Sequence, residues 1–282
     1  MAMSALTAIP ALSDRDLATI TRLVYTKSGI SLHSGKRALV TARLQKLLKR
    51  SGLGTFKEYI RHLQSDRTGG EMTAMLDAIA TNHTAFFRES QHFEFLAKIV
   101  LPALRAREET SAILGWCAAC SSGEEPYTIA MTALEQFSGN PGRPLRLLAS
   151  DLSTKALTRA AAGVYKMDRV AGMPRHLVLK YFEKGGDLPA GTVRIAEHVR
   201  RVIEFRQLNL LDAPPPGRPL DFIFCRNVLI YFDRSVQQGV VERLEERLAY
   251  GGYLFTSHSE SLNGLKHNLT WVAPAVYRRE RS

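Results

Sequence analysis

The sequence predicts an α/β protein in which an all-α region at the N-terminus precedes an open, mainly parallel sheet. Two observations support this fold class. In residues 1–80 apolar side chains recur at helical spacing, whereas from about residue 112 short apolar runs alternate with helix-length segments. Strands that alternate with helices are typical of parallel βαβ units. We therefore expect a helical domain over residues 1–80, a linker and junction helix over 81–111, and an α/β domain over 112–282.

The composition is that of a globular protein with an excess of positive charge. The 282 residues include 38 Lys and Arg against 27 Asp and Glu, which gives a formal charge of +11, and 45% are hydrophobic. No apolar run reaches the roughly 18 residues that span a bilayer, and there are only three cysteines, so we expect a cytoplasmic protein without membrane insertion or a disulfide framework. A basic protein favours an acidic partner, which is a nucleic acid, an anionic membrane surface or an acidic protein.

Much of the positive charge falls in the N-terminal helices. Residues 1–80 hold 12 basic and 6 acidic residues, so 12 − 6 gives +6 of the +11. Ser13 is a typical N-cap residue, and the apolar residues after it recur at helical intervals up to Val24. The segment 36–50 carries six basic residues and no acid. Its apolar residues fall on one arc of a helix and most of its basic residues on the opposite arc, including Lys36, Arg43, Lys46, Lys49 and Arg50.

The α/β region is assigned from short apolar runs in chain order. Strands are predicted at 112–117, 144–150, 220–225 and 252–256, and helices at 124–137, 153–162 and 235–249. The run 271–277 is expected to form an antiparallel edge strand, as mixed sheets often carry one. One stretch breaks the alternation, because 181–205 has two β-like runs, 192–196 and 199–205, and no helix-length pattern. We expect a small antiparallel insert there, over about 178–206.

The turn after the first strand has the composition of a ligand site. It is rich in small residues, which allow close approach to the backbone, but lacks the spacing of a phosphate-binding loop. Glu124 and Glu125 open the next helix, and Asp151 ends the next strand, where open α/β folds place an acid on ribose hydroxyls. An acid-lined nucleoside site that disfavours phosphate fits S-adenosylmethionine. The turn taken alone is equally consistent with a simple helix cap.

Cys117 and Cys120 raise an alternative, because this spacing also serves thiol redox and zinc sites. A structural zinc site needs about four ligands, and the sequence has no second pair of cysteines. We therefore expect no metal site.

Polar residues elsewhere are candidates because of where they fall in the predicted fold. Asn82, Thr84 and Arg88 cluster at the domain junction, where ligand clefts often form, although they also fit a linker helix. The strand 220–225 runs into Arg226 and Asn227, which places both at its carboxyl end. Three further candidates follow neighbouring strands: Asn209, Leu210 and Tyr231, the last of which is also consistent with a core residue.

Six motifs occur in the order found in the CheR family of bacterial chemotaxis receptor methyltransferases, which the chain resembles from about Leu12 to Val276. They are NHTAFFRE, WCAACSSGEEPYTIAM, LLASDLSTKAL, FRQLNLLD, DFIFCRNVLIYFD and GYLFTSHSESL. Cys117 departs from the pattern, since a small polar residue is expected there, which makes the cysteine pair look accidental. The resemblance implies an N-terminal helical domain, a Rossmann-like domain that binds S-adenosylmethionine, and a small β-subdomain inserted in it.

The resemblance also implies a reaction and its residues. The family transfers a methyl group from S-adenosylmethionine to glutamate side chains of chemoreceptors, giving glutamate methyl esters and S-adenosylhomocysteine, in chemotactic adaptation. Tyr231 would lie near the transferred methyl group, and Arg105 is a weaker catalytic candidate. Asp151 would hold the ribose hydroxyls and Arg88 the methionyl carboxylate or a neighbouring acid. The full cofactor set is Asn82, Thr84, Arg88, Glu124, Asp151, Asn209, Leu210, Arg226 and Asn227.

Two partner surfaces and two rival functions follow. Lys36, Arg43, Lys46 and Arg50 would dock on the acidic methylation helices of receptors, or else form a plain solvated face. The insert would add a receptor's C-terminal peptide as an extra strand. A nucleic-acid methyltransferase is favoured by the charge alone, but Cys-Arg-Asn-Val stands after residue 224 in place of the motif expected for a flipped base, so no nucleic-acid partner is expected. A non-catalytic binding protein is the other rival.

Overall fold

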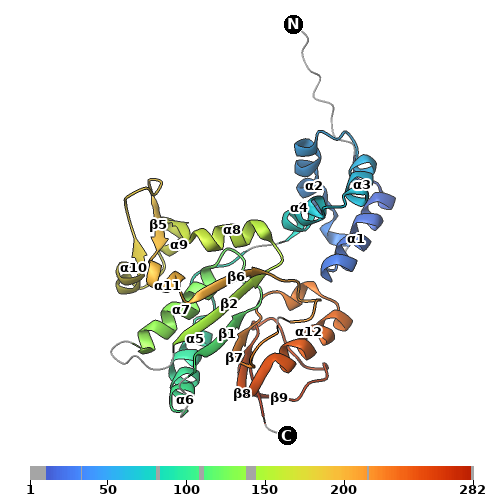
Figure 1. The fold of residues 1–282 in the computed structure, drawn as a ribbon. Coiled ribbons are helices and arrows are strands. Elements are labelled where there is room, and N and C mark those ends of the chain that lie inside the picture. The colour runs from blue at the N-terminus through green and yellow to red at the C-terminus, as the bar shows by residue number, and fades with distance from the viewer. Residues whose placement is uncertain are drawn as a thin grey trace. The chain divides into compact units, whose positions relative to one another are not determined.

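The computed structural model describes residues 11–32, 34–80, 83–107, 111–137, 144–214 and 216–280. The chain forms two compact units (Figure 1), of which the first comprises Met1–Thr81 with Tyr231–Asp233 and the second Asn82–Ile230 with Arg234–Ser282. No helix within the described ranges is both long and apolar enough to cross a bilayer.

The first unit is helical, as predicted for residues 1–80. Its core is built from the apolar stripes of the helices, with Ile20, Leu44 and Tyr59 fully buried. Ser13 is the N-cap of the first helix, because its Oγ accepts a hydrogen bond from the backbone N–H of Asp16 at 3.1 Å. The elements are α1 (Asp14–Ser28), η1 (Ser34–Lys36), α2 (Arg37–Ser51), α3 (Phe56–Ser65) and α4 (Gly70–Ile79).

The second unit is built on a seven-stranded sheet whose order is β6-β2-β1-β7-β8-β10-β9 (Figure 1). The first five strands in this order are mutually parallel, and β10 pairs antiparallel with both of its neighbours, β8 and β9. The strands are β1 (Ile113–Cys117), β2 (Leu145–Asp151), β6 (Ile203–Gln207), β7 (Leu220–Phe224), β8 (Leu248–Phe255), β9 (Leu269–Ala273) and β10 (Val276–Arg279). The run 271–277, expected as one edge strand, spans the turn of a hairpin instead, and Ala275 at φ 58° lies in that turn.

Helices cover the sheet on both faces. One face carries the helical run α5 (Gln91–Phe95), η2 (Leu96–Val100) and α6 (Leu101–Arg105), together with α7 (Glu124–Phe137), which share a buried cluster with the sheet. The other face carries α12 (Arg234–Arg247), whose Val240 and Leu244 lie with Trp116 of β1 around one cavity. The predicted helix over 124–137 is confirmed at both ends, and α8 (Thr154–Ala162) begins one residue after its predicted start.

A small antiparallel sheet lies between β2 and β6 along the chain. It has the order β3-β5-β4, with β3 (Val164–Lys166), β4 (Phe182–Glu183) and β5 (Thr192–Ile195), and α9 (Met167–Val170), α10 (Arg175–Tyr181) and α11 (Glu197–Arg200) accompany it. The expectation that 199–205 belongs to this insert was wrong. Residues 197–200 are helical, and Ile203–Gln207 is β6, which pairs with β2 at the edge of the main sheet. A segment with alternating apolar and polar residues fits the edge of either sheet, so this alternation does not show which strand the segment pairs with.

Candidate functional site

The turn between β1 and α7 has a backbone that only a few residue types accept. Gly123 has φ 97°, and a Cβ there would lie 2.8 Å from Tyr165 Oη and 2.9 Å from Ala160 Cβ. Ser121 also has a positive φ of 48°, and its buried Oγ has no hydrogen-bond partner within the described part of the chain. A buried hydroxyl without a partner costs free energy, so this atom is suited to a ligand.

Asp151 is held against this turn. One of its carboxylate oxygens accepts a hydrogen bond from the backbone N–H of Ser121 and the other from that of Ser153, both at 2.8 Å. The carboxyl ends of two adjacent parallel strands, β1 and β2, meet here. The acid is therefore fixed where an open α/β sheet binds ligands.

Glu124, at the start of α7, connects the turn to two other segments. Its side chain is 2% exposed, accepts a hydrogen bond from Ser122 Oγ at 2.7 Å and forms an ion pair with Arg169. Arg169 also donates to the backbone carbonyl of Thr84 at 2.5 Å. Glu124, Thr84 and the β1–α7 turn are thus joined through Arg169.

Arg226 is the centre of a second, buried network. Its guanidinium is fully buried and forms ion pairs with Glu125 at 2.6 Å and Glu89 at 3.2 Å. It also donates to the backbone carbonyl of Arg88 at 2.8 Å. The end of β7, the start of α7 and the segment before α5 are therefore joined through one side chain. Its two terminal nitrogens contact protein partners, while the buried Nε has no hydrogen-bond partner among the described residues, so the side chain braces the site.

The two carboxylates of this network respond differently to their surroundings. Burial raises the pKa of Glu125, and Arg226 offsets only part of that effect. Burial would also raise the pKa of Glu89, but Arg226 and the backbone N–H of His258 outweigh it, so the pKa is lowered. Glu89 is therefore ionised at neutral pH, and the charge of Arg226 is matched.

The loop after β7 is shaped by another acid. Asn227 has φ 58°, and its backbone N–H donates to Glu260 at 2.8 Å. Glu260 also accepts from the backbone N–H groups of Ile230, at 3.3 Å, and Ser257, at 2.9 Å. This carboxylate fixes the end of β7 against the end of β8.

Asn209 and Leu210 line a small pocket on the α12 face of the sheet, next to Trp116. Asn209 Oδ1 accepts a hydrogen bond from the backbone N–H of Leu211 at 3.1 Å, and Arg243 Nε donates to the carbonyl of Leu210 at 3.1 Å. Trp116 donates its indole N–H to Ser150, the residue before Asp151. The cavity wall is thereby tied to the same strand end as the acid.

Asn82 lies outside the described residues, and two other predicted residues, Arg105 and Tyr231, contact other parts of the chain. Arg105 donates to the carbonyl of Gln136 at 2.8 Å, near the last residue of α7, whereas Glu124 is the first. At about 1.5 Å per residue the two ends of α7 are about 18 Å apart, so Arg105 lies far from the strand ends. Tyr231 ends η3 (Leu229–Tyr231), four residues after Asn227 along the chain, and its ring contacts Lys36 of the first unit.

The predicted basic stripe is only partly exposed. Lys46, Lys49 and Arg50 are exposed along α2. Arg43 is half-buried and donates to the carbonyls of Ile79, at 2.5 Å, and Ala80, at 3.2 Å, so it caps the end of α4. Lys36 belongs to η1, with its ammonium 5.3 Å from the centre of the Tyr231 ring. The helical projection missed these roles because it does not include the neighbouring elements.

The cysteine pair is not arranged as a reactive site. Cys117, Cys120 and Cys225 are free and buried, and burial raises the pKa of each thiol. A catalytic or metal-binding thiol needs the opposite shift, toward the thiolate.

Sequence reasoning missed three residues that hold these groups in place, Glu89, Arg169 and Glu260, and it named Glu125 only for its charge and not for its pairing with Arg226. Glu89, Glu125 and Glu260 stand inside the quoted motifs NHTAFFRE, WCAACSSGEEPYTIAM and GYLFTSHSESL, which gave a signal that acids matter there. Arg169 lies outside every motif, and only the fold shows its position.

Comparison with known proteins gives a consistent result over almost the whole chain. The family description "CheR methyltransferase, SAM binding domain" matches residues 82–277, and "CheR methyltransferase, all-alpha domain" matches residues 15–80. The chain is 40% identical to chemotaxis protein methyltransferase 2 of Pseudomonas aeruginosa, covering 93% of this chain and 92% of the relative. It is 38% identical to the chemotaxis protein methyltransferases of Borreliella burgdorferi, with 94% of each chain covered, and Escherichia coli, with 95% of this chain and 91% of the relative covered.

Proposed function

Because this chain belongs to the CheR methyltransferase family, we propose that it methylates glutamate side chains of chemoreceptors at the carboxyl ends of β1, β2 and β7. The products are a glutamate methyl ester and S-adenosylhomocysteine. The observation that carries this proposal is the acid-lined turn, in which Asp151 is fixed against Ser121 in a family member matched over both domains.

The residues at the turn fit S-adenosylmethionine. The buried Ser121 Oγ has no partner among the described residues, and the positive φ angles of Ser121 and Gly123 open the backbone to a close ligand. The carboxylates of Asp151 and Glu124 lie at the turn with the single guanidinium of Arg169, so the net charge there is negative, which suits a cation without phosphate. When bound, S-adenosylmethionine supplies a methyl group on a sulfonium leaving group.

We assign the cofactor contacts to the residues that these networks hold. Asp151 takes the ribose hydroxyls, Glu124 and Thr84 lie on either side of Arg169, and Asn209 and Leu210 line the pocket next to Trp116. Arg88 takes the methionyl carboxylate, and Asn82 and Asn227 complete the set. Arg226 is a positioning residue, because its side chain holds Glu125, Glu89 and the Arg88 carbonyl.

The chemistry needs little acid–base help from the protein. A substrate glutamate, with an ordinary pKa near 4.3, is already ionised at neutral pH and attacks without a general base. The protein contributes by orienting this carboxylate in line with the methyl group and by removing water from it. We assign the orienting role to Tyr231. A Tyr231→Phe variant should lower kcat while the affinity for S-adenosylmethionine is unchanged.

Transfer of radiolabel from methyl-labelled S-adenosylmethionine to receptor-containing membranes tests the activity. Mild alkali should release the label as volatile methanol, because methyl esters hydrolyse and N-methylated bases do not. Label that resists alkali would favour the nucleic-acid methyltransferase. Cofactor binding without transfer to any receptor would favour the non-catalytic binding protein.

We also propose that the exposed basic residues of α2 dock along acidic receptor helices in the cytoplasm. Support comes from the exposure of Lys46, Lys49 and Arg50 on one helix within a region of net charge +6. Reversing these three to Glu should weaken methylation of full receptors and leave cofactor affinity unchanged. Arg43 is left out of the test, since its loss would uncap α4. Unchanged methylation would indicate a plain solvated surface.

For the small sheet we propose addition of a receptor's C-terminal peptide as a further strand. Support comes from its two edges, β3 and β4, which pair with β5 on one side only in the described sheet. Since Phe182 and Ile195 are paired, residues 183–194 can be replaced by Asn-Gly while β6 stays intact. Peptide titration against wild type and this variant should show binding to the wild type alone, with cofactor affinity as the control. Equal binding to both proteins would refute the assignment.

A further inference from the structure

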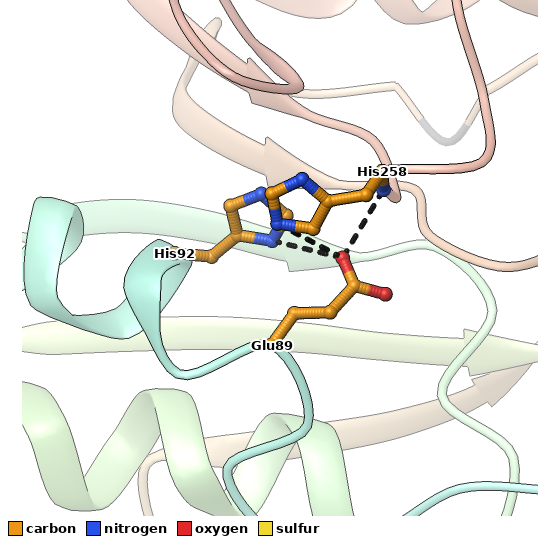
Figure 2. A group of neighbouring side chains, drawn as sticks. All are labelled: Glu89, His92 and His258. Atoms are coloured by element: carbon orange, nitrogen blue, oxygen red, sulfur yellow. Dashed lines mark hydrogen bonds and ion pairs between the residues drawn. The ribbon is translucent and has the colours of Figure 1, made fainter.

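Three side chains converge between the segment before α5 and the loop after β8 (Figure 2). Glu89 Oε2 lies 3.6 Å from His92 Nδ1 and 3.7 Å from His258 Nε2, and the three atoms lie within 4.8 Å of one another. His92 is buried, and the two imidazole rings are stacked at 4.9 Å with an angle of 8°. Residues 166 positions apart therefore present two imidazole nitrogens to one carboxylate.

The hydrogen bonding of His92 determines which nitrogen is available. His92 Nε2 lies 3.4 Å from the backbone carbonyl of Pro274, which can only accept, so Nε2 carries the proton. Nδ1 then bears a lone pair, and this buried atom has no hydrogen-bond partner in the described ranges. A lone pair that faces a carboxylate is unfavourable unless a cation lies between them. An imidazole that donates from one nitrogen to a carbonyl while the other faces outward is the usual arrangement of a metal ligand.

The local charge also favours a cation. Glu89 and Glu125 are two carboxylates joined to the single guanidinium of Arg226, which leaves one negative charge when both are ionised. With its one proton on Nε2, the His92 ring presents Nδ1 as a neutral donor atom, the form of imidazole that binds metals.

We propose that Glu89, His92 and His258 form a zinc-class metal site, with a fourth position open to water. Two imidazoles and a carboxylate are ligands that Zn²⁺ accepts, at about 2.0–2.2 Å, which places tetrahedral ligand atoms about 3.3 Å apart. The two measured distances from Glu89 lie within a few tenths of an ångström of that value. The two rings are nearly parallel, so their in-plane lone pairs do not converge on one point, and His258, 40% exposed, would rotate out of the stack to bind the ion. The ion would brace the loop after β8 against Glu89 and, through it, Arg226. This site is independent of the proposed substrate.

Binding of metal to the full chain tests the site directly. After treatment with EDTA, the protein is titrated with Zn²⁺ by calorimetry and with Co²⁺ by visible absorption. Wild type should bind one equivalent of Zn²⁺, and Co²⁺ should give d–d bands without thiolate charge-transfer bands. His258→Ala should weaken Zn²⁺ binding about 100-fold or more, because it removes one of three ligands. His258 is on a loop and exposed, so this variant should fold.

The matched control is His176→Ala, which removes an exposed histidine of α10 from the second unit. This variant should bind Zn²⁺ as the wild type does, and added Zn²⁺ should raise its Tm and that of the wild type but not that of His258→Ala. Equal Zn²⁺ affinity of wild type and His258→Ala would overturn the proposal. Thiolate charge-transfer bands would overturn it too, because they would assign the ion to Cys117, Cys120 or Cys225.

Discussion

Arg226 connects three segments that are distant in sequence through contacts made by one side chain. Its fully buried guanidinium joins two carboxylates and a backbone carbonyl from the start of α7 and the segment before α5. Removing one partner of a buried charge pair leaves the other charge without compensation, which is more costly than loss of a surface pair.

Arg226→Ala should therefore lower the free energy of unfolding by about 3–5 kcal/mol, measured by urea denaturation. Arg226→Lys keeps the charge but loses the two-pronged donor, so its effect should be intermediate. Arg201→Ala is the matched control, since it removes a 75% exposed arginine paired with Glu197, and it should change the stability by less than about 1 kcal/mol. A similar loss in Arg201→Ala and Arg226→Ala would contradict the role given to the buried network.

At this scale the sequence places acids at strand ends better than it places arginine side chains. Asp151 and Glu124 lie where the strand–turn–helix pattern placed them, because local geometry fixes their positions. The contacts of Arg43 and Arg105 were not foreseen, because a long, flexible side chain reaches helix carbonyls that only the tertiary structure brings near. Arg169 was missed for the same reason.

Among the elements, the β1–α7 turn depends on one backbone conformation. Gly123→Ala would adopt φ near 97° and place a methyl group 2.8 Å from Tyr165 Oη. We expect a loss of about 1–3 kcal/mol in stability and weaker binding of S-adenosylmethionine, measured by denaturation and calorimetry. Gly172→Ala should have little effect, since a Cβ at Gly172 meets no atom within 4 Å. Wild-type cofactor affinity in Gly123→Ala would show that the turn tolerates another conformation.

The Asp66 carboxylate, which lies before α4, should make the free energy of unfolding fall at low pH. Asp66 accepts hydrogen bonds from Thr68 Oγ1 at 2.6 Å and from the backbone N–H groups of Thr68 and Glu71, which lowers its pKa from 3.8 to about 2. Because the folded pKa is the lower one, the stabilisation is fully present above about pH 4 and is lost as the pH falls toward 2. The stability difference between wild type and Asp66→Asn should shrink over that window.

Urea denaturation at several pH values measures this difference. Thr68→Ala removes one donor to Asp66 and should reduce the pH-dependent part without abolishing it. A difference between wild type and Asp66→Asn that stays constant from pH 5 to pH 2 would show that the carboxylate contributes nothing through its charge.

Element types were predicted better than element partners. The bounds of α7 and the positions of β1, β2, β7 and β8 along the chain follow from apolar spacing and turn residues. The assignment of 199–205 failed because strand pairing is a tertiary property, and the hairpin of β9 and β10 was missed because its turn has no Gly or Asn, with Ala275 in the positive φ position instead. The Glu89–His92–His258 cluster had no sequence signal, since Glu89 and His258 come from separate motifs and His92 from none.

At the scale of the whole molecule, the uneven distribution of charge predicts that receptor binding weakens as the salt concentration rises. The N-terminal 80 residues carry +6 of the total +11, whereas the cofactor turn is lined by carboxylates. Exposed charges are screened beyond about 8 Å at physiological ionic strength. The KM for receptor substrate should therefore rise with added NaCl, while the KM for S-adenosylmethionine changes little.

Initial rates at several NaCl concentrations provide the measurement. The Lys46→Glu, Lys49→Glu, Arg50→Glu variant should show a weaker salt dependence than wild type, because the attraction that salt screens is already gone. Parallel salt curves for both proteins would place the receptor contact elsewhere on the surface.

The position of the small sheet within the chain has a consequence for protein engineering. It departs after α8 and returns at β6, and α8 contacts both β6 and its partner β2. The excursion is thus bounded by framework elements that contact each other without it. Chimeras that exchange residues 175–200 between homologues, and so keep Tyr165 and Arg169 at the β1–α7 turn, should bind S-adenosylmethionine as the wild type does.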